Sequence, residues 1–142
     1  MKNITKKFTS FLLVAILMGT MAFSAYAASN SVSFSLSTGS GSGFVDGASN
    51  GKFYSLTKGT ADLAMKDSAS CASGTYYMTL YKYNPLGMGM GTSCGSMTAS
   101  GAGPNATHSK TFTIPSDGNK YYFYVSGSVA YVTFASSGTL SQ

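Results

Sequence analysis

One stretch decides the fold of this chain: KYYFYVSG at residues 120–127. It holds five consecutive residues that favour β-strands, and the turn formers PSDGN at residues 115–119 precede it. Side chains alternate across a strand, so Tyr122 and Tyr124 share one face while Phe123 lies on the other. This aromatic strand predicts a β-sheet protein whose other strands pair with it.

The rest of the chain is rich in short alternating segments that glycine and serine separate. Residues 31–37, for example, alternate serine with Val32, Phe34 and Leu36, as a half-buried strand does. About eight such segments predict one all-β domain, an antiparallel two-sheet β-sandwich of jelly-roll or Greek-key type. The expected strands are residues 31–37, 52–56, 61–66, 75–83, 110–114, 120–127 and 129–134, with the methionine–glycine alternation at 86–90 as a further candidate.

Residues 1–27 have the pattern of a secretory signal peptide. Three lysines precede an apolar run at residues 11–18, and AYA at residues 25–27 is a small-x-small cleavage site. The apolar run is too short for a stable membrane span. We therefore expect a secreted, extracellular protein that begins at Ala28 and is not inserted stably into a membrane.

Charge is low once the leader is removed. The net charge of +5 includes the three leader lysines, and the remaining chain has a net charge of +2. It contains neither arginine nor a cluster of lysines. Nucleic acid is therefore not an expected partner, because nucleic-acid binding needs a basic patch.

Cys71 and Cys94 are the two cysteines of the chain. Because the leader directs them to an oxidising compartment, we expect a structural disulfide between them, which would stabilise the fold by about 3 kcal/mol. A redox or nucleophilic role is not expected, because the spacing is not Cys-x-x-Cys.

Residues suited to catalysis or metal binding are sparse. The one histidine, His108, stands in a glycine- and proline-rich segment at residues 98–109, where we expect a solvated loop residue. A Ser-His-Asp site that uses Asp117 stays open, although no Gly-x-Ser-x-Gly elbow supports it. The carboxylates stand in turns, loops or outward strand positions and are not grouped as glycoside hydrolysis requires, so we expect no enzyme, no cofactor and no metal. They are Asp46, Asp62, Asp67 and Asp117.

Tyrosines are the strongest candidates for a binding surface. If the outward faces of strands 75–83 and 120–127 lie on one sheet, they form an aromatic platform that can stack on sugar rings or polymer surfaces. The alternative is that these rings fill the core or pair across strands. The candidate residues are Tyr77, Tyr81, Tyr83, Tyr122 and Tyr124.

Three segments resemble the pre-peptidase C-terminal domains of secreted bacterial proteins. They are FYSLTKGT at residues 53–60, MTLY at residues 78–81 and the stretch at residues 118–127. The acidic residues that such domains often carry before the second segment are replaced here by Tyr76 and Tyr77. The resemblance implies a small β-sandwich with a non-catalytic accessory or binding role.

We therefore expect a secreted, non-enzymatic β-sandwich that binds the cell envelope, an extracellular polymer such as a polysaccharide, or a partner protein. One alternative is a fibre or matrix subunit that self-assembles through exposed strands, as the uncharged aromatic strand suggests. Another is a small cationic antimicrobial protein, which the low charge disfavours.

Overall fold

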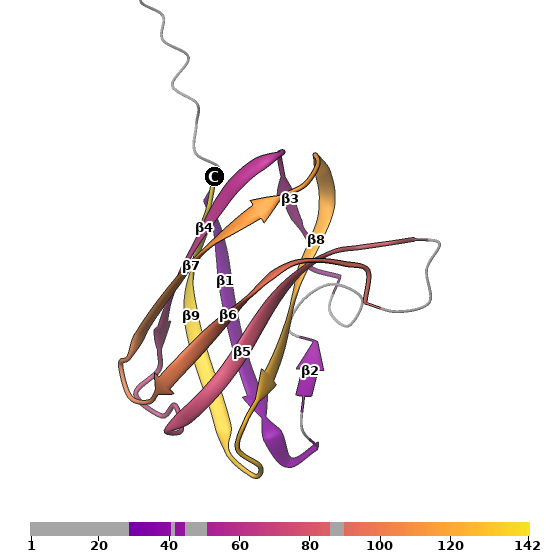
Figure 1. Cartoon of the computed structure of the whole chain (residues 1–142). Coiled ribbons are helices and arrows are strands. Elements are labelled where there is room, and N and C mark those ends of the chain that lie inside the picture. The colour runs from indigo at the N-terminus through magenta and orange to yellow at the C-terminus, as the bar shows by residue number, and fades with distance from the viewer. Residues whose placement is uncertain (1–28, 41, 45–50, 86–89) are drawn as a thin grey trace, which may run out of the picture.

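The computed structural model describes residues 29–40, 42–44, 51–85 and 90–142 (Figure 1). The expected signal peptide and Ala28 lie outside the described residues, as does most of the methionine–glycine segment. In the described part, no helix is long and apolar enough to cross a membrane. The elements are β1 (Ser29–Ser37), the 3₁₀ helix η1 (Thr38–Ser40), β2 (Ser42–Phe44), β3 (Tyr54–Leu56), β4 (Gly59–Asp67), β5 (Gly74–Lys82), β6 (Thr92–Ala102), β7 (Thr107–Ile114), β8 (Gly118–Gly127) and β9 (Thr133–Ser141).

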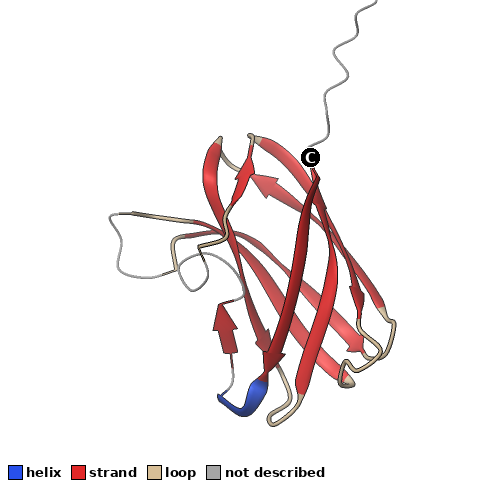
Figure 2. Ribbon diagram, turned by 180° about the vertical axis from the view of Figure 1, so that it is seen from behind, coloured by secondary structure: helices blue, strands red, loops and turns tan. Residues whose placement is uncertain are grey.

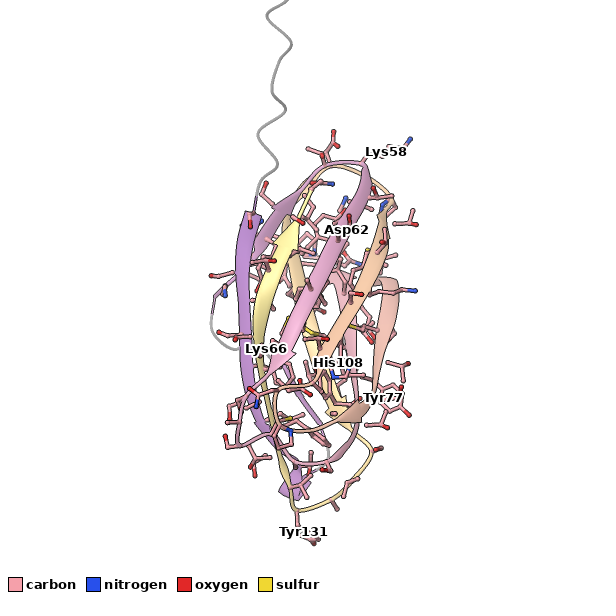
Figure 3. All side chains as sticks on the ribbon, turned by 90° about the vertical axis from the view of Figure 1, so that its left-hand side faces the viewer. Lys58, Asp62, Lys66, Tyr77, His108 and Tyr131 are labelled. Atoms are coloured by element: carbon pink, nitrogen blue, oxygen red, sulfur yellow. The ribbon has the colours of Figure 1, made fainter. Side chains whose placement is uncertain are left out.

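The strands form two antiparallel sheets that pack face to face (Figures 1 and 2). The first sheet has the order β1-β9-β4-β7, and Figure 3 looks onto its outer face. The second has the order β2-β8-β5-β6, with β3 also paired to β8. The predicted two-sheet sandwich is therefore confirmed. Its strand order is that of a jelly roll in which two short strands, β2 and β3, share one position.

Alternate side chains of the long strands meet between the two sheets. The predicted alternation in β5 and β8 is confirmed, and the face that carries Met78 and Phe123 is the inner one, because both side chains are fully buried. Each large side chain taken out of water contributes about 1.5–3 kcal/mol to folding. The largest buried side chains are Tyr54, Tyr76, Tyr121, Phe112, Phe123 and Phe134.

The C-terminal segment differs from the sequence prediction. The pattern predicts a last strand at residues 129–134 and a polar tail, but β9 runs from Thr133 to Ser141. Phe134 and Leu140 are buried near its two ends, and two small residues, Ser136 and Gly138, occupy the positions between them in the alternation. A segment that looks like a tail is therefore an interior strand, flanked by β1 and β4.

The segment at residues 98–109 is also not the loop that its glycine and proline content predicts. β6 continues to Ala102 and β7 begins at Thr107, so the connection between them is short. Ala99 and Ala102 are buried small residues of β6, which explains why this part of the strand has no obvious apolar pattern.

Candidate functional site

The outer face of the second sheet gathers aromatic rings. Tyr81 and Tyr122 face each other across β5 and β8, and their rings stack with centroids 5.7 Å apart and planes 21° apart. Phe53, just before β3, meets Tyr83 edge-on at 5.6 Å and Tyr122 at 6.3 Å. We call Phe53, Tyr81, Tyr83 and Tyr122 the aromatic cluster.

The four rings of the aromatic cluster are not equally accessible. Tyr122 is only 4% exposed, and its hydroxyl donates a hydrogen bond to the carbonyl of Met90. Burial raises the pKa of Tyr122, and the neighbouring Tyr81 and Tyr83 raise it further. Phe53, Tyr81 and Tyr83 are half-buried. The rings of Phe53 and Tyr81 therefore pack against the buried ring of Tyr122, and Tyr83 packs against Phe53.

Lys120 brings a positive charge to the aromatic cluster. Its Nζ lies 5.4 Å from the ring centre of Tyr83 and 5.8 Å from that of Phe53, within the range of a cation–π contact. Lys120 is exposed, so its ammonium group can also donate hydrogen bonds to a ligand at the rim of the cluster.

Sequence reasoning missed Phe53 and Lys120, although alternation carried a signal for both. Lys120 stands two residues before Tyr122 and therefore shares its face of β8. Phe53 directly precedes Tyr54, which is buried, so its side chain points to the other side. Only the fold shows that the start of β3 lies beside β8 and brings Phe53 to the tyrosines.

Tyr77 and Tyr124 lie on the same outer face, away from the stacked pair. Tyr77 is 41% exposed and stands four residues before Tyr81, about 14 Å along β5. Tyr124 lies opposite Thr79, between these two levels of the sheet, and is half-buried. Three of the five candidate tyrosines are thus in the aromatic cluster, and the other two extend the face along the strands.

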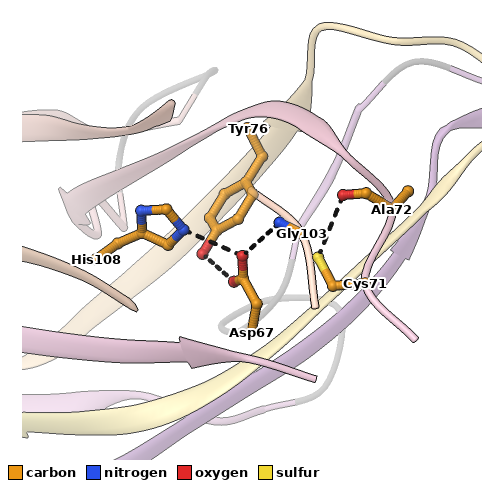
Figure 4. A network of polar contacts seen from close by, with 6 residues as sticks. All are labelled: Asp67, Cys71, Ala72, Tyr76, Gly103 and His108. Atoms are coloured by element: carbon orange, nitrogen blue, oxygen red, sulfur yellow. Dashed lines mark hydrogen bonds and ion pairs between the residues drawn. The ribbon is translucent and has the colours of Figure 1, made fainter. Parts of the chain in front are cut away.

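A second polar site surrounds Asp67 at the end of β4 (Figure 4). Asp67 is 1% exposed. The Tyr76 hydroxyl donates to its Oδ1 at 3.0 Å, the Gly103 N–H donates to its Oδ2 at 3.2 Å, and His108 Nε2 lies 3.1 Å from the same Oδ2. The carboxylate therefore ties β4 to β5, to β7 and to the connection that follows β6.

Burial and hydrogen bonding act in opposite directions on Asp67. Burial would raise the pKa of its carboxyl group, but the hydrogen bonds from His108, Gly103 and Tyr76 and the charge interaction with His108 lower it below the ordinary value. Burial also raises the pKa of the Tyr76 hydroxyl and of the nearby Cys71 thiol. The site therefore holds an ionised carboxylate, and burial disfavours the deprotonated forms of the neighbouring Tyr76 hydroxyl and Cys71 thiol.

The sequence predictions for Asp67 and His108 were wrong. Asp67 is not in an outward position, and His108 is not a solvated loop residue, since it lies in β7 with a side chain that is 9% exposed. Asp117 does not pair with His108 but accepts a hydrogen bond from the Lys58 N–H at 2.7 Å. Among the described residues, no group of three or more His, Cys, Asp or Glu side chains could hold a metal ion.

The predicted disulfide is also wrong, because Cys71 and Cys94 are both free. Cys71 is buried just before β5, whereas Cys94 lies in β6 beside the far end of β5, between the partners of Thr79 and Tyr81. From the start of β5, next to Cys71, to the level of Cys94 is six residues along the strand, or about 20 Å. A disulfide needs Cα atoms within about 7 Å of each other. A signal peptide indicates an oxidising compartment, but it does not determine how far apart two cysteines lie in the fold.

No protein-family model matches this sequence, and no match is found among curated proteins. The function of the chain therefore has to follow from the two sites described above. The aromatic cluster offers three partly exposed rings, two of which, Tyr81 and Tyr83, carry a hydroxyl group, and this suits stacking on another molecule. The Asp67 site is closed and internally satisfied, which suits a structural role.

Proposed function

We propose that this chain is a secreted, non-enzymatic module that binds an extracellular polysaccharide on the aromatic cluster. One observation carries the proposal: the half-buried rings of Phe53 and Tyr81 are held at fixed angles against the buried ring of Tyr122. A ligand that meets rings already held in place loses less conformational freedom with them than with mobile side chains.

The chemistry of the aromatic cluster matches that of a sugar ring. A pyranose has apolar C–H faces and a rim of hydroxyl groups, so an aromatic face can cover the former while polar groups bond the latter. Tyr81 and Tyr83 present both an apolar ring and a hydroxyl group. The ammonium group of Lys120 lies at the rim, where it can donate to sugar oxygens or to an acidic sugar.

The length of the outer face favours a polymer over a single sugar. Tyr77 lies about 14 Å from Tyr81 along β5, and Tyr124 stands between the two levels on β8. A chain that runs along the strands can contact these rings at once, and several weak contacts on one polymer add up to a useful affinity.

The described carboxylates support a non-enzymatic role because each has another task in a different place. Asp67 is buried in its own hydrogen-bond network. Asp62 points outward from the opposite sheet and accepts a hydrogen bond from Thr111 at 2.5 Å. Asp117 caps the Lys58 N–H before β4. None of the three lies on the outer face that carries the aromatic cluster.

Co-sedimentation of the purified protein with insoluble cell wall, chitin and cellulose tests the proposal. We expect one polymer to deplete the protein, and Tyr83→Ala to weaken that binding about 10- to 100-fold by removing one contact ring. Tyr131→Ala is the matched control, because Tyr131 is 86% exposed between β8 and β9, away from the aromatic cluster.

Two outcomes would sink the proposal. One is a protein that stays in solution with every polymer, and the other is a loss of binding that is equal for Tyr83→Ala and Tyr131→Ala. Circular dichroism of both variants checks that each is folded. A polymer-free tube shows whether the protein sediments by itself, which keeps self-association separate from binding.

A further inference from the structure

β1 is an edge strand of unusual regularity. In the described part of the chain it pairs on one side only, with β9. The pairing is one to one from Ser29 opposite Ser141 to Ser37 opposite Thr133, without a register shift. In Figure 3, β1 lies at one side of the sheet, beside β9.

The backbone groups on the free side of β1 can be assigned. Thr38 continues the register with β9, and its N–H donates to the Val132 carbonyl at 2.8 Å. Even-numbered residues of β1 therefore bond β9, and odd-numbered residues point their N–H and C=O groups away from it. The Lys52 ammonium group agrees with this assignment, because it reaches the Ser31 carbonyl from outside at 2.9 Å. The outward groups belong to Ser29, Ser31, Ser33, Ser35 and Ser37.

The other edge strands carry features that hinder pairing with another chain, whereas β1 has none of its own. β2 and β3 are three residues long, and β6 has two register irregularities against β5. β7 carries Lys110, an exposed charge on the same face as buried Phe112. β1 has nine residues without a charge, a proline or a bulge, and the Lys52 ammonium group occupies its Ser31 carbonyl.

We propose that a second copy of this chain adds its β1 to this edge in antiparallel orientation, with the two-fold axis at Ser33. This register overlaps the whole strand: Ser31 pairs with Ser35 of the second copy, and Ser29 with Ser37. On the inner face it sets Val32 opposite Phe34 of the second copy, an apolar pair, and on the outer face serine meets serine. Such an isologous contact closes on itself and gives a dimer.

A second copy fits this edge because the strand is complementary to itself. Both partners bring uncharged residues, so no like charges meet across the new ladder except where each Lys52 approaches Ser31. The first sheet then runs through both copies as one surface. The aromatic cluster lies on the other sheet and contributes no residue to the proposed ladder, although its Phe53 directly follows Lys52, which bonds Ser31.

Sedimentation velocity over a dilution series from about 1 to 100 μM tests the proposal, since even weak association is populated at the upper end. A thiol reductant is present because Cys94 is a half-buried free thiol. We expect a concentration-dependent dimer. Ser33→Pro should weaken it about 100-fold, because proline removes the outward N–H at the two-fold axis, where the monomer does not use it.

Ser35→Lys is a second variant that does not touch the backbone. It places a lysine opposite Ser31 of the second copy, where the second Lys52 already stands, so like charges meet. We expect it to weaken the dimer about tenfold or more. Ser109→Lys is the matched control: it makes the same exchange on the same outer face, but in β7 opposite Ala64, and should leave the dimer unchanged.

Several results would overturn the proposal. A monomer at every concentration contradicts it directly. A dimer that both folded variants leave intact shows that another surface is used. Open-ended oligomers point to head-to-tail pairing of β1 with another edge, such as β7, and exclude the two-fold dimer. If circular dichroism shows that Ser33→Pro does not fold, Ser35→Lys and its control decide the question.

Discussion

The two outer faces of the sandwich share one core but expose different chemistries. Along β1 and β7, the outward positions of the first sheet carry serine and threonine hydroxyl groups. The second sheet presents rings, above all the stacked pair of Tyr81 and Tyr122. A shallow depression of about 320 Å³ does lie over Ala64 on the hydroxyl face, but among the described residues the only ring that lines it is that of His108.

This difference shows which positions the fold constrains. Inward residues on both sheets must fill the same core, so they are apolar on either side. Outward residues do not have to fill the core, so a difference between the two outer faces indicates that the faces serve different functions. The serine-rich outward side of β1 suits an uncharged surface beside a pairing edge, and an aromatic face suits a ligand.

The largest loss of stability is expected where the backbone of a neighbouring strand leaves no room for a side chain. A Cβ added at Gly138, in β9, would overlap the carbonyl oxygen of Ala64 in β4, and a backbone atom of an interior strand cannot rotate away. We expect Gly138→Ala to cost more than about 4 kcal/mol of unfolding free energy, or to prevent folding. Urea denaturation followed by circular dichroism measures this cost.

Gly39→Ala is the control for this substitution, because an added Cβ at Gly39 meets nothing within 4 Å. Its unfolding free energy should stay within about 0.5 kcal/mol of wild type. A Gly138→Ala variant of wild-type stability would show that β4 and β9 can move apart, and would remove the reason for glycine in this strand.

The next largest loss of unfolding free energy is expected from removing the buried one of two carboxylates in β4. Asp67 points into the sandwich and accepts from Tyr76 and Gly103, while Asp62 points outward and accepts from Thr111. Asp67→Ala leaves buried donors without a partner and should cost about 3 kcal/mol. Asp62→Ala should change the unfolding free energy by about 0.5 kcal/mol or less.

The difference between the two carboxylates should also depend on pH. Because the folded state lowers the pKa of Asp67, its contribution is present above the ordinary value of 3.8 and is lost as the pH falls below it. Wild type and Asp67→Ala should therefore approach each other in stability in acid. Equal costs for the two substitutions at neutral pH would contradict the inward assignment of Asp67.

The parts of the fold that the sequence predicts are those with apolar inward residues. β1, β5 and β8 show their alternation directly, but in β5 and β8 alternation alone did not tell which face is buried, because both faces carry aromatic rings. β9 could not be recognised because Ser136 and Gly138 occupy positions where a core strand usually has apolar residues. Strand order also lies beyond local patterns, because β1 pairs with the opposite end of the chain.

The sites were predictable to a similar extent. Alternation indicated that Tyr77 and Tyr81 share one face of their strand, but only the structure shows that this face is an outer one and that Tyr81 stacks on Tyr122. The contact between Asp67 and His108 joins residues that are 41 apart in sequence, and no local pattern announces it. Cysteine counting failed for the same reason, because a pairing depends on distance across the fold and not on composition.

The smallest effect is expected on the unfolding free energy at alkaline pH. Tyr76 is fully buried, and burial raises the pKa of its hydroxyl above the ordinary value of 10.0. Above pH 10 the unfolded chain releases this proton and the folded chain keeps it, so stability is complete below pH 10 and falls as the pH rises. The slope from one such group is about 1.4 kcal/mol per pH unit.

Tyr76→Phe isolates this contribution. The variant loses the hydrogen bond to Asp67 and is less stable at neutral pH, but it should lose stability more slowly than wild type above pH 10. The slope does not vanish, because burial also raises the pKa of Tyr121 and of Tyr122. Urea midpoints measured at steps from neutral pH to pH 11 give both slopes. Parallel curves would mean that the Tyr76 hydroxyl is reached by water, and that the Asp67 site is less closed than its 1% exposure indicates.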